Sequence, residues 1–240
     1  MSPETVGNRD RFHGAVQARS FRGEDGQMTG QRFAWPGPDQ LRVPGGDGGG
    51  ERVHQARVAA ARSSFGRKGY TQTSIDEIAA AARVTKGAVY HHFAGKKALF
   101  RAVYSEVEAE AQARTAGAVD PEGSPIDQIV AGVNAYLDVA LDEEIQRITL
   151  VDGPVVLGLE PEGPAEQQPG YVALRVFIAT AIAQGQLVDL DPGVLAHLVG
   201  GLSLLGGLLI ARSGDPDGTR AALRPALDAM LRGLAPDARR

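Results

Sequence analysis

The residues best suited to chemistry lie in the stretch TKGAVYHHF, residues 85–93, which contains Lys86, Tyr90, His91 and His92. Two histidines could suggest a metal site. Neighbouring residues on a helix point about 100° apart, however, and no third ligand lies at a usable spacing. The stretch therefore predicts no metal site, and we treat it as an ordinary core helix or a surface that contacts another molecule.

Other kinds of reactive site lack support in the sequence. The absence of cysteine excludes disulfides, thiolate metal sites and cysteine nucleophiles. We find no Ser-His-Asp or paired-carboxylate spacing, and LDEE at 141–144 is interpreted as a solvated helix end. PGGDGGG at 44–50 lacks the preceding strand and the Lys-Ser/Thr of a phosphate loop. We predict no catalytic residue, no metal and no cofactor.

The net charge of −4 conceals an uneven distribution. Residues 51–102 carry ten Lys+Arg and three Asp+Glu, whereas residues 103–240 carry nine and twenty. A basic segment attached to an acidic body is typical of a module that binds a polyanion.

Residues 1–50 contain eleven Gly and four Pro and show no sustained apolar period. Such a segment cannot bury enough apolar area to offset its ordering entropy. We predict a disordered extension, either a flexible arm or an upstream over-extension of the reading frame.

The basic segment begins with a predicted helix within residues 52–70. Val58 and Phe65 fall on one face of this helix, and Gly66 or Gly69 ends it.

A second helix follows in TSIDEIAAAA, residues 73–82. Its start matches a capping box or the acidic variant, formed by Thr73 with Asp76 or by Ser74 with Glu77. After a turn of about three residues, Thr85 can cap a third short helix.

In the third helix, Val89 and Phe93 form the core pair. Gly87 and His91 then point directly away from the core, and Tyr90 and His92 lie on its flanks. A short helix, a three-residue turn and another short helix make a helix-turn-helix arrangement, in which the second helix of the pair enters the major groove.

The stretch GYTQTSIDEIAAAARVTKGAVYHHFAGKKALF, residues 69–100, resembles the DNA-binding domain of TetR-family transcriptional regulators. The shared pattern is GY, two residues, T, S/T, an aliphatic residue, two residues and IA, continued after the turn by V-S/T-x-G-x-aliphatic-Y-x-H-F, K and L. The sequence departs from the family at Arg83, which occupies the turn position where Gly is usual. A left-handed backbone there would cost arginine roughly 1 kcal/mol.

The resemblance implies a role for each matching residue. Base edges or the groove floor would be contacted by Thr85, Lys86 and Gly87. Phosphates would be contacted by Thr73 or Ser74, by Tyr90, His91 and His92, and by Lys96 at the start of the fourth helix. Tyr90 and His92 could instead pack on the helix flanks, and Lys86 could be a solvated helix start.

Beyond residue 100 the sequence is helical in character, and nothing sustained alternates at a period of two. A long helix over 96–114 joins the two parts. We expect a break at Gly153–Pro154 and a final helix kinked or restarted near Pro225. The fold class is all-α, divided into a disordered extension (1–50), a helix-turn-helix DNA-binding domain (51–100) and a body for ligand binding and dimerisation (101–240).

The apolar run 194–211 just reaches the length of a membrane span. Because it is single and lies between amphipathic helices, we predict a buried helix and no membrane span. Gly200, Ser203 and Gly207 form a stripe of small residues. The stripe packs either within the chain or, as the family resemblance implies, against the same helix of a partner in a homodimer.

The resemblance also implies a ligand cavity lined by residues of about 126–182. The ligand would be small and fairly apolar. Candidate ligand residues are Asn134, Tyr136, Arg147, Asp152, Arg175 and Phe177, with His197 further along.

The resulting hypothesis is a cytoplasmic, dimeric transcriptional repressor that binds a palindromic site on double-stranded DNA and is released by the ligand. Two alternatives remain, a DNA-binding regulator or activator without an effector and an all-α enzyme.

Overall fold

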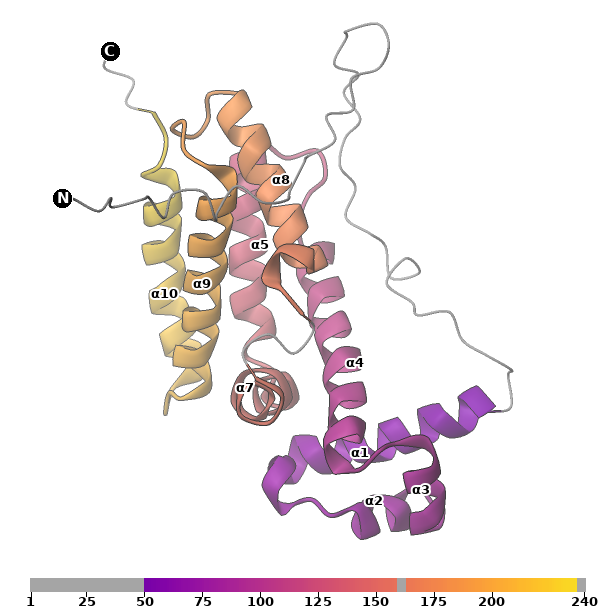
Figure 1. Ribbon diagram of the computed structural model, residues 1–240. Helices are drawn as coiled ribbons and strands as arrows, with labels where there is room; N and C mark the ends of the chain where they lie inside the picture. Colours follow the sequence, from indigo (N-terminus) through magenta and orange to yellow (C-terminus); the bar gives the residue numbers. More distant parts are fainter. Residues whose placement is uncertain (1–49, 159–162, 237–240) are drawn as a thin grey trace, which may run out of the picture. The chain divides into compact units, whose positions relative to one another are not determined.

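The computed structural model describes residues 50–158 and 163–236, which form helices with no strand among them, so the predicted all-α class is confirmed. The predicted disordered extension lies outside the described residues, apart from Gly50. In chain order the α-helices are α1 (Gly50–Gln72), α2 (Ile75–Ala81), α3 (Lys86–His92), α4 (Lys96–Gly117), α5 (Pro125–Val139), α6 (Glu143–Ile145), α7 (Gly153–Leu157), α8 (Pro169–Ala183), α9 (Pro192–Ala211) and α10 (Pro216–Arg232) (Figure 1). A π-helix, η1 (Gln146–Asp152), precedes α7, and a 3-10 helix, η2 (Ala165–Gln167), precedes α8.

The helix-turn-helix is formed by α2 and α3. Ser74 caps α2 by accepting the N–H of Glu77 at 3.2 Å, so the alternative cap by Thr73 is wrong. Thr85 caps α3 by accepting the N–H of Ala88 at 3.2 Å, as predicted. In the turn between the helices, Arg83 has a φ of 56°, so it adopts the left-handed conformation that is unfavourable for arginine.

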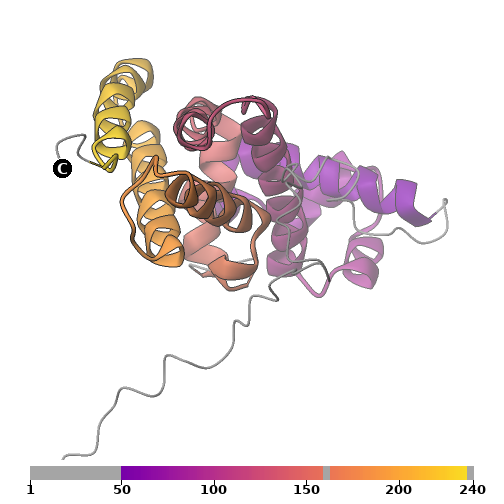
Figure 2. The same ribbon diagram turned by 90° about the horizontal axis from the view of Figure 1, so that it is seen from above.

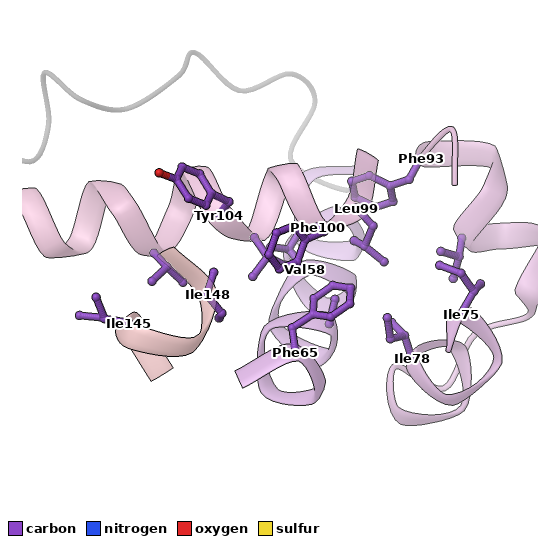
Figure 3. Packing of buried hydrophobic residues seen from close by; sticks show 14 of the residues in the cluster. Val58, Phe65, Ile75, Ile78, Phe93, Leu99, Phe100, Tyr104, Ile145 and Ile148 are labelled. Carbon is purple, nitrogen blue, oxygen red and sulfur yellow. The ribbon is translucent and has the colours of Figure 1, made fainter. Parts of the chain in front are cut away.

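One hydrophobic cluster joins the helix-turn-helix to the body. Phe65 of α1 and Phe100 of α4 are fully buried and meet edge to face, with ring centroids 5.1 Å apart. Ile145 and Ile148, from α6 and η1, pack into the same cluster (Figure 3). The predicted boundary near residue 100 falls within α4 and within this shared core, so it does not coincide with a break in packing.

A second hydrophobic cluster lies within the body. Leu137, Ile178 and Ile210, from α5, α8 and α9, are fully buried in it. Helix α10 adds Leu227, and α9 and α10 run side by side (Figures 1 and 2).

The predicted break at Gly153–Pro154 is wrong. Gly153 has helical backbone angles, and the chain leaves the helical path earlier, between α5 and α6. Pro154 lies in the first turn of α7, where its missing N–H is tolerated. A Cβ on Gly153 would lie 2.6 Å from Cε2 of Tyr104, so α4 approaches η1 and α7 too closely for a side chain at this position.

Two further predictions concern the last helices. Helix α10 is continuous through Pro225, so no restart occurs there. Helix α9 begins at Pro192 and is long and apolar enough to cross a membrane by length and composition alone, a test that core helices of soluble proteins also pass.

Candidate DNA-binding surface and regulatory body

The N-terminal turn of α3 presents two exposed residues, Lys86 and Gly87. Lys86 Nζ lies 2.9 Å from Asp76 Oδ2 of α2, and the hydrogen bond to this carboxylate raises the pKa of Lys86. Solvent screens an exposed ion pair of this kind, so another anion can replace the carboxylate at little cost. A Cβ on Gly87 would meet only Thr85 Oγ1, at 4.0 Å, so packing within the chain does not require glycine there.

The rest of α3 directs three polar rings to the surface. Tyr90 is 50% exposed, and His91 and His92 are also exposed, with their ring centroids 5.1 Å apart. Tyr90 and His92 are thus accessible to another molecule, and the part of Tyr90 that is covered agrees with the alternative of a half-buried packing residue. Val89 and Phe93 are buried beneath them, as the helix angles predicted.

The two candidates before α2 differ in accessibility. Thr73 is 2% exposed, and its hydroxyl lies within hydrogen-bond distance of the carbonyl oxygens of Gly69 (2.8 Å) and Ser64 (3.2 Å). The predicted phosphate contact by Thr73 is therefore contradicted, because its only donor is used inside the protein. Ser74 is exposed.

Lys96 is the first residue of α4, as predicted, and follows Gly95, whose φ is 102°. Its Nζ lies 3.4 Å from the carbonyl oxygen of Thr71 and 4.3 Å from the centre of the Tyr70 ring. Both contacts hold the ammonium group at the last turn of α1, after the kink at Gly69. The lysine is thus positioned beside the helix-turn-helix rather than extended along α4.

The sequence analysis did not predict the set of polar contacts that links α1 to the body, which we call the α1–body contacts. Arg62 of α1 pairs with Glu144 at 2.6 Å and with Glu110 at 2.8 Å, and these bonds raise the pKa of Arg62. Asp152 Oδ2 accepts the backbone N–H of Tyr70 at 2.7 Å. Each partner lies 48 to 82 positions away, so no local pattern could have revealed the pairing.

The predicted ligand residues do not gather around one cavity. Asp152 takes part in the α1–body contacts, where it accepts the backbone N–H of Tyr70. Asn134 is buried, and its Nδ2 donates to Asp228 Oδ1 of α10 at 2.8 Å. Tyr136 packs against α9, where a Cβ on Gly207 would lie 3.2 Å from its ring, and burial raises the pKa of Tyr136.

The remaining candidates lie elsewhere. Arg175 and Phe177 are half-buried on α8. His197 is exposed, with Nδ1 3.0 Å from the Tyr171 hydroxyl and Nε2 3.1 Å from Glu166.

Of the predicted ligand residues, Arg147 lines an open groove of about 1500 Å3 between α1, η1 and the end of α9. Apolar and charged side chains share its wall. The groove residues include Arg62, Arg67, Arg147, Leu150, Val151, Val155, Leu204, Leu208 and Arg212.

The small-residue stripe on α9 is buried within the chain over much of its length. A Cβ on Gly207 would lie 3.2 Å from Leu150, and Ser203 donates to the carbonyl oxygen of Val199 at 2.9 Å. The predicted dimer contacts at Ser203 and Gly207 are therefore contradicted, and internal packing is what the structure shows. Gly200 is half-buried with open space beyond its Cα.

The opposite side of α9 carries exposed apolar residues, which we call the outer face. These residues recur at intervals of three and four, the spacing of one helix face. They are Val194, Leu198, Gly201, Leu205 and Leu209.

Two protein-family models match the sequence of this chain. Residues 58–103 match the model of bacterial regulatory proteins of the tetR family. Residues 126–234 match the model of the tetracyclin repressor-like C-terminal domain. The chain belongs to the TetR family.

Individual relatives agree with this membership. The TetC protein of transposon Tn10 from Escherichia coli is 31% identical over 151 residues, which cover 62% of this chain and 75% of TetC. The A-factor receptor protein of Streptomyces griseus is 40% identical over 183 residues, 75% of this chain and 61% of the receptor. A crystal structure of a TetR-family transcriptional regulator from Pectobacterium atrosepticum is 35% identical, with a TM-score of 0.64 and coverage of 77% of this chain and 95% of that one.

As a TetR-family member, the protein is a ligand-responsive, DNA-binding transcriptional regulator. Such regulators are soluble proteins that bind operator DNA as dimers, and the relatives found are regulators rather than enzymes.

Proposed function

We propose that this regulator is a cytoplasmic repressor without enzymatic activity, released from a palindromic operator by a small, fairly apolar ligand. The observation that carries the proposal is the exposed N-terminal turn of α3, where Lys86 and Gly87 project from a capped helix. Recognition helices contact bases mainly through their N-terminal residues. A long cation can reach the acceptors on a guanine edge, and a glycine lets the backbone approach the groove.

Thr85 would act with Lys86 and Gly87 at the base edges. Phosphates would be contacted by Ser74, Tyr90, His91, His92 and Lys96, all of which lie at least partly on the surface. Phosphate contacts fix the register on DNA and make the affinity depend on salt, whereas base contacts select the sequence. We do not include Thr73 among the phosphate contacts, because its hydroxyl donates a hydrogen bond to the carbonyl oxygen of Gly69.

The outer face of α9 is the proposed dimer contact in place of the small-residue stripe. Its leucines are exposed, and α10 beside it exposes Met230. A two-fold dimer would present two copies of α3, which favours an inverted-repeat operator.

The ligand would act by shifting the population between two arrangements of α1 and the body. Contacts through Arg62–Glu144 and Tyr70–Asp152 connect the two parts, so a ligand that favours another geometry at η1 would also move the helix-turn-helix. The groove containing Arg147 is the proposed ligand site, because it touches both α1 and η1. One relative is named a receptor protein, which supports ligand binding by this chain.

The proposal is tested by selecting bound DNA from a random pool with the full chain. We expect an inverted repeat, and its placement over a promoter should block transcription in vitro. Enrichment of a single half-site, or of no sequence, would contradict the dimeric recognition. Activation from the same site would favour the alternative of an activator.

A further inference from the structure

Arg57 of α1 is a buried cation that forms no salt bridge with any residue whose side chain the structure describes. Only 6% of its surface is exposed, and its Nε and Nη1 atoms have no hydrogen-bond partner. Buried polar groups are nearly always hydrogen-bonded, and a buried charge without a partner is strongly unfavourable. Such a group indicates that an acceptor is missing from this state of the protein.

The surroundings of Arg57 are also cationic or able to become so. His54, one turn earlier on α1, has its ring 5.0 Å from that of Phe93. Burial, followed by the positive charges of Arg57, His91 and His54, lowers the pKa of His92. Groups from two helices, α1 and α3, therefore converge at the C-terminal end of α3.

The acidic residues of the neighbouring helix α2 are engaged elsewhere. Asp76 pairs with Lys86 at the other end of α3, and Glu77 pairs with Lys68 at 2.5 Å. On the α4 side, Lys96 is directed toward the last turn of α1. Within the part of the chain that the structure describes, the charges that act on His92 are thus positive, so the cluster is suited to an anion.

We propose that Arg57, together with His54 and His92, holds a phosphate of the operator backbone at the C-terminal end of α3. The inference rests on the proposed DNA-binding function and adds two residues of α1 to it. A phosphate supplies several acceptor oxygens for guanidinium and imidazole donors. DNA is favoured as the source because the cluster adjoins the helix that would enter the major groove.

The proposal requires Arg57 to move outward. Its long side chain can keep its methylene groups on the apolar core while the guanidinium turns to the surface. In free protein Nε and Nη1 of the guanidinium have no hydrogen-bond partner, and on DNA they gain charged acceptors. Arg57 would therefore oppose folding stability and favour DNA binding, a combination that a purely structural residue does not produce.

The decisive variant is Arg57→Leu, which replaces the buried charge with an apolar side chain. We expect a melting temperature equal to or above that of the wild type. We also expect roughly ten-fold weaker binding to every DNA sequence, because a hydrogen bond to a charged group is lost, and a salt slope lower by about 1. Arg114→Leu is the matched control, because it removes an exposed arginine from the C-terminal part of α4, outside the DNA-binding surface and the groove, and should leave the salt slope unchanged.

Protonation gives a second readout. A phosphate should raise the pKa of His92 in the complex above its value in free protein, so DNA binding should take up protons. The extra affinity is fully present below the free-state pKa and is lost as pH rises through the bound-state pKa. The double variant His54→Gln/His92→Gln should flatten this dependence between pH 5 and 8.

The outcomes separate this inference from the proposed function. If wild-type protein selects an operator but Arg57→Leu binds it with unchanged affinity and salt slope, the phosphate site is wrong and the DNA-binding function stands. If wild-type protein selects no DNA, both fail. A titration of the free protein with inorganic phosphate, followed by the NMR chemical shifts of His54 and His92, tests the remaining possibility. Shifts that reach a plateau at millimolar phosphate without DNA would identify a free-anion site and overturn the assignment to DNA.

Discussion

Polar side chains are mostly exposed in the helix-turn-helix, whereas in the body they form hydrogen bonds between helices. In α3, Lys86 and His91 are exposed above a small buried core. In the body, Asn134 and Asp152 are taken up by hydrogen bonds that join helices. A short capped helix has few neighbours, so its polar side chains remain available to another molecule. Polar residues on packed body helices are first used to hold those helices together.

The two sides of α9 repeat this contrast on a single helix. The side with Gly206 and Gly207 is buried against the chain's own α5 and η1, because a Cβ at either position would lie within about 3 Å of a neighbouring side chain. The outer face leaves Leu198 and Leu205 exposed. Small residues here indicate close packing within one chain, and large exposed leucines indicate a second chain.

The largest expected effect comes from Leu205→Glu on the outer face of α9. The charge should prevent dimer formation, and loss of the linked second half-site should weaken operator binding by about a hundred-fold or more. Sedimentation and binding to a two-half-site DNA measure both quantities. Ala179→Glu adds the same charge at an exposed position of α8 and should change neither. A variant that stays dimeric would remove the outer face from the interface.

Gly153→Ala tests how tightly the body is packed. The new Cβ would lie 2.6 Å from Tyr104 and 3.0 Å from the Ile148 carbonyl oxygen, so we expect the free energy of unfolding to fall by about 1–3 kcal/mol. Urea unfolding at fixed protein concentration measures the change. Gly132→Ala in α5 is the control, since its nearest contact would be 3.7 Å away and alanine should stabilise the helix by about 0.5–1 kcal/mol. Equal stability of the two variants would contradict the close approach of α4.

Gly87→Ala has the smallest expected effect on stability and separates stability from recognition. The Cβ has open space, so we expect the free energy of unfolding to rise by about 0.5–1 kcal/mol. Operator affinity should nevertheless fall, because the added methyl group lies where the backbone approaches the groove. Unfolding and DNA titration on one preparation give both values. A more stable variant with undiminished affinity would show that Gly87 has no role at the DNA.

Local patterns in the sequence predicted the helix-turn-helix well. The caps at Ser74 and Thr85 and the core pair Val89–Phe93 involve residues within four positions of one another, which periodicity and capping rules can recognise. The accessibility of each candidate side chain depends instead on tertiary packing, which these rules do not describe. The burial of Thr73 depends on the bend of α1 at Gly69, and its hydroxyl is used there.

Long-range pairing in the body could not be read in the same way. Asn134 bonds to a residue 94 positions later, and Arg62 to one 82 positions later. The π-helical register of η1 also carries the chain through Gly153–Pro154, where the composition predicted a break. Arg57 gave no signal in the sequence, since only its burial without a partner sets it apart from the other arginines of the basic segment.

The central claim is that the N-terminal turn of α3 selects the DNA sequence through Lys86. The most direct test is to select DNA from one random pool in parallel with wild-type protein and with Lys86→Ala. We predict that the variant still enriches an inverted repeat with the same half-site spacing, but loses its preference at one base pair in each half-site, at a cost of about 1–3 kcal/mol for that position. The same consensus at every position, with affinity lowered uniformly, would contradict the claim and reduce Lys86 to a backbone contact.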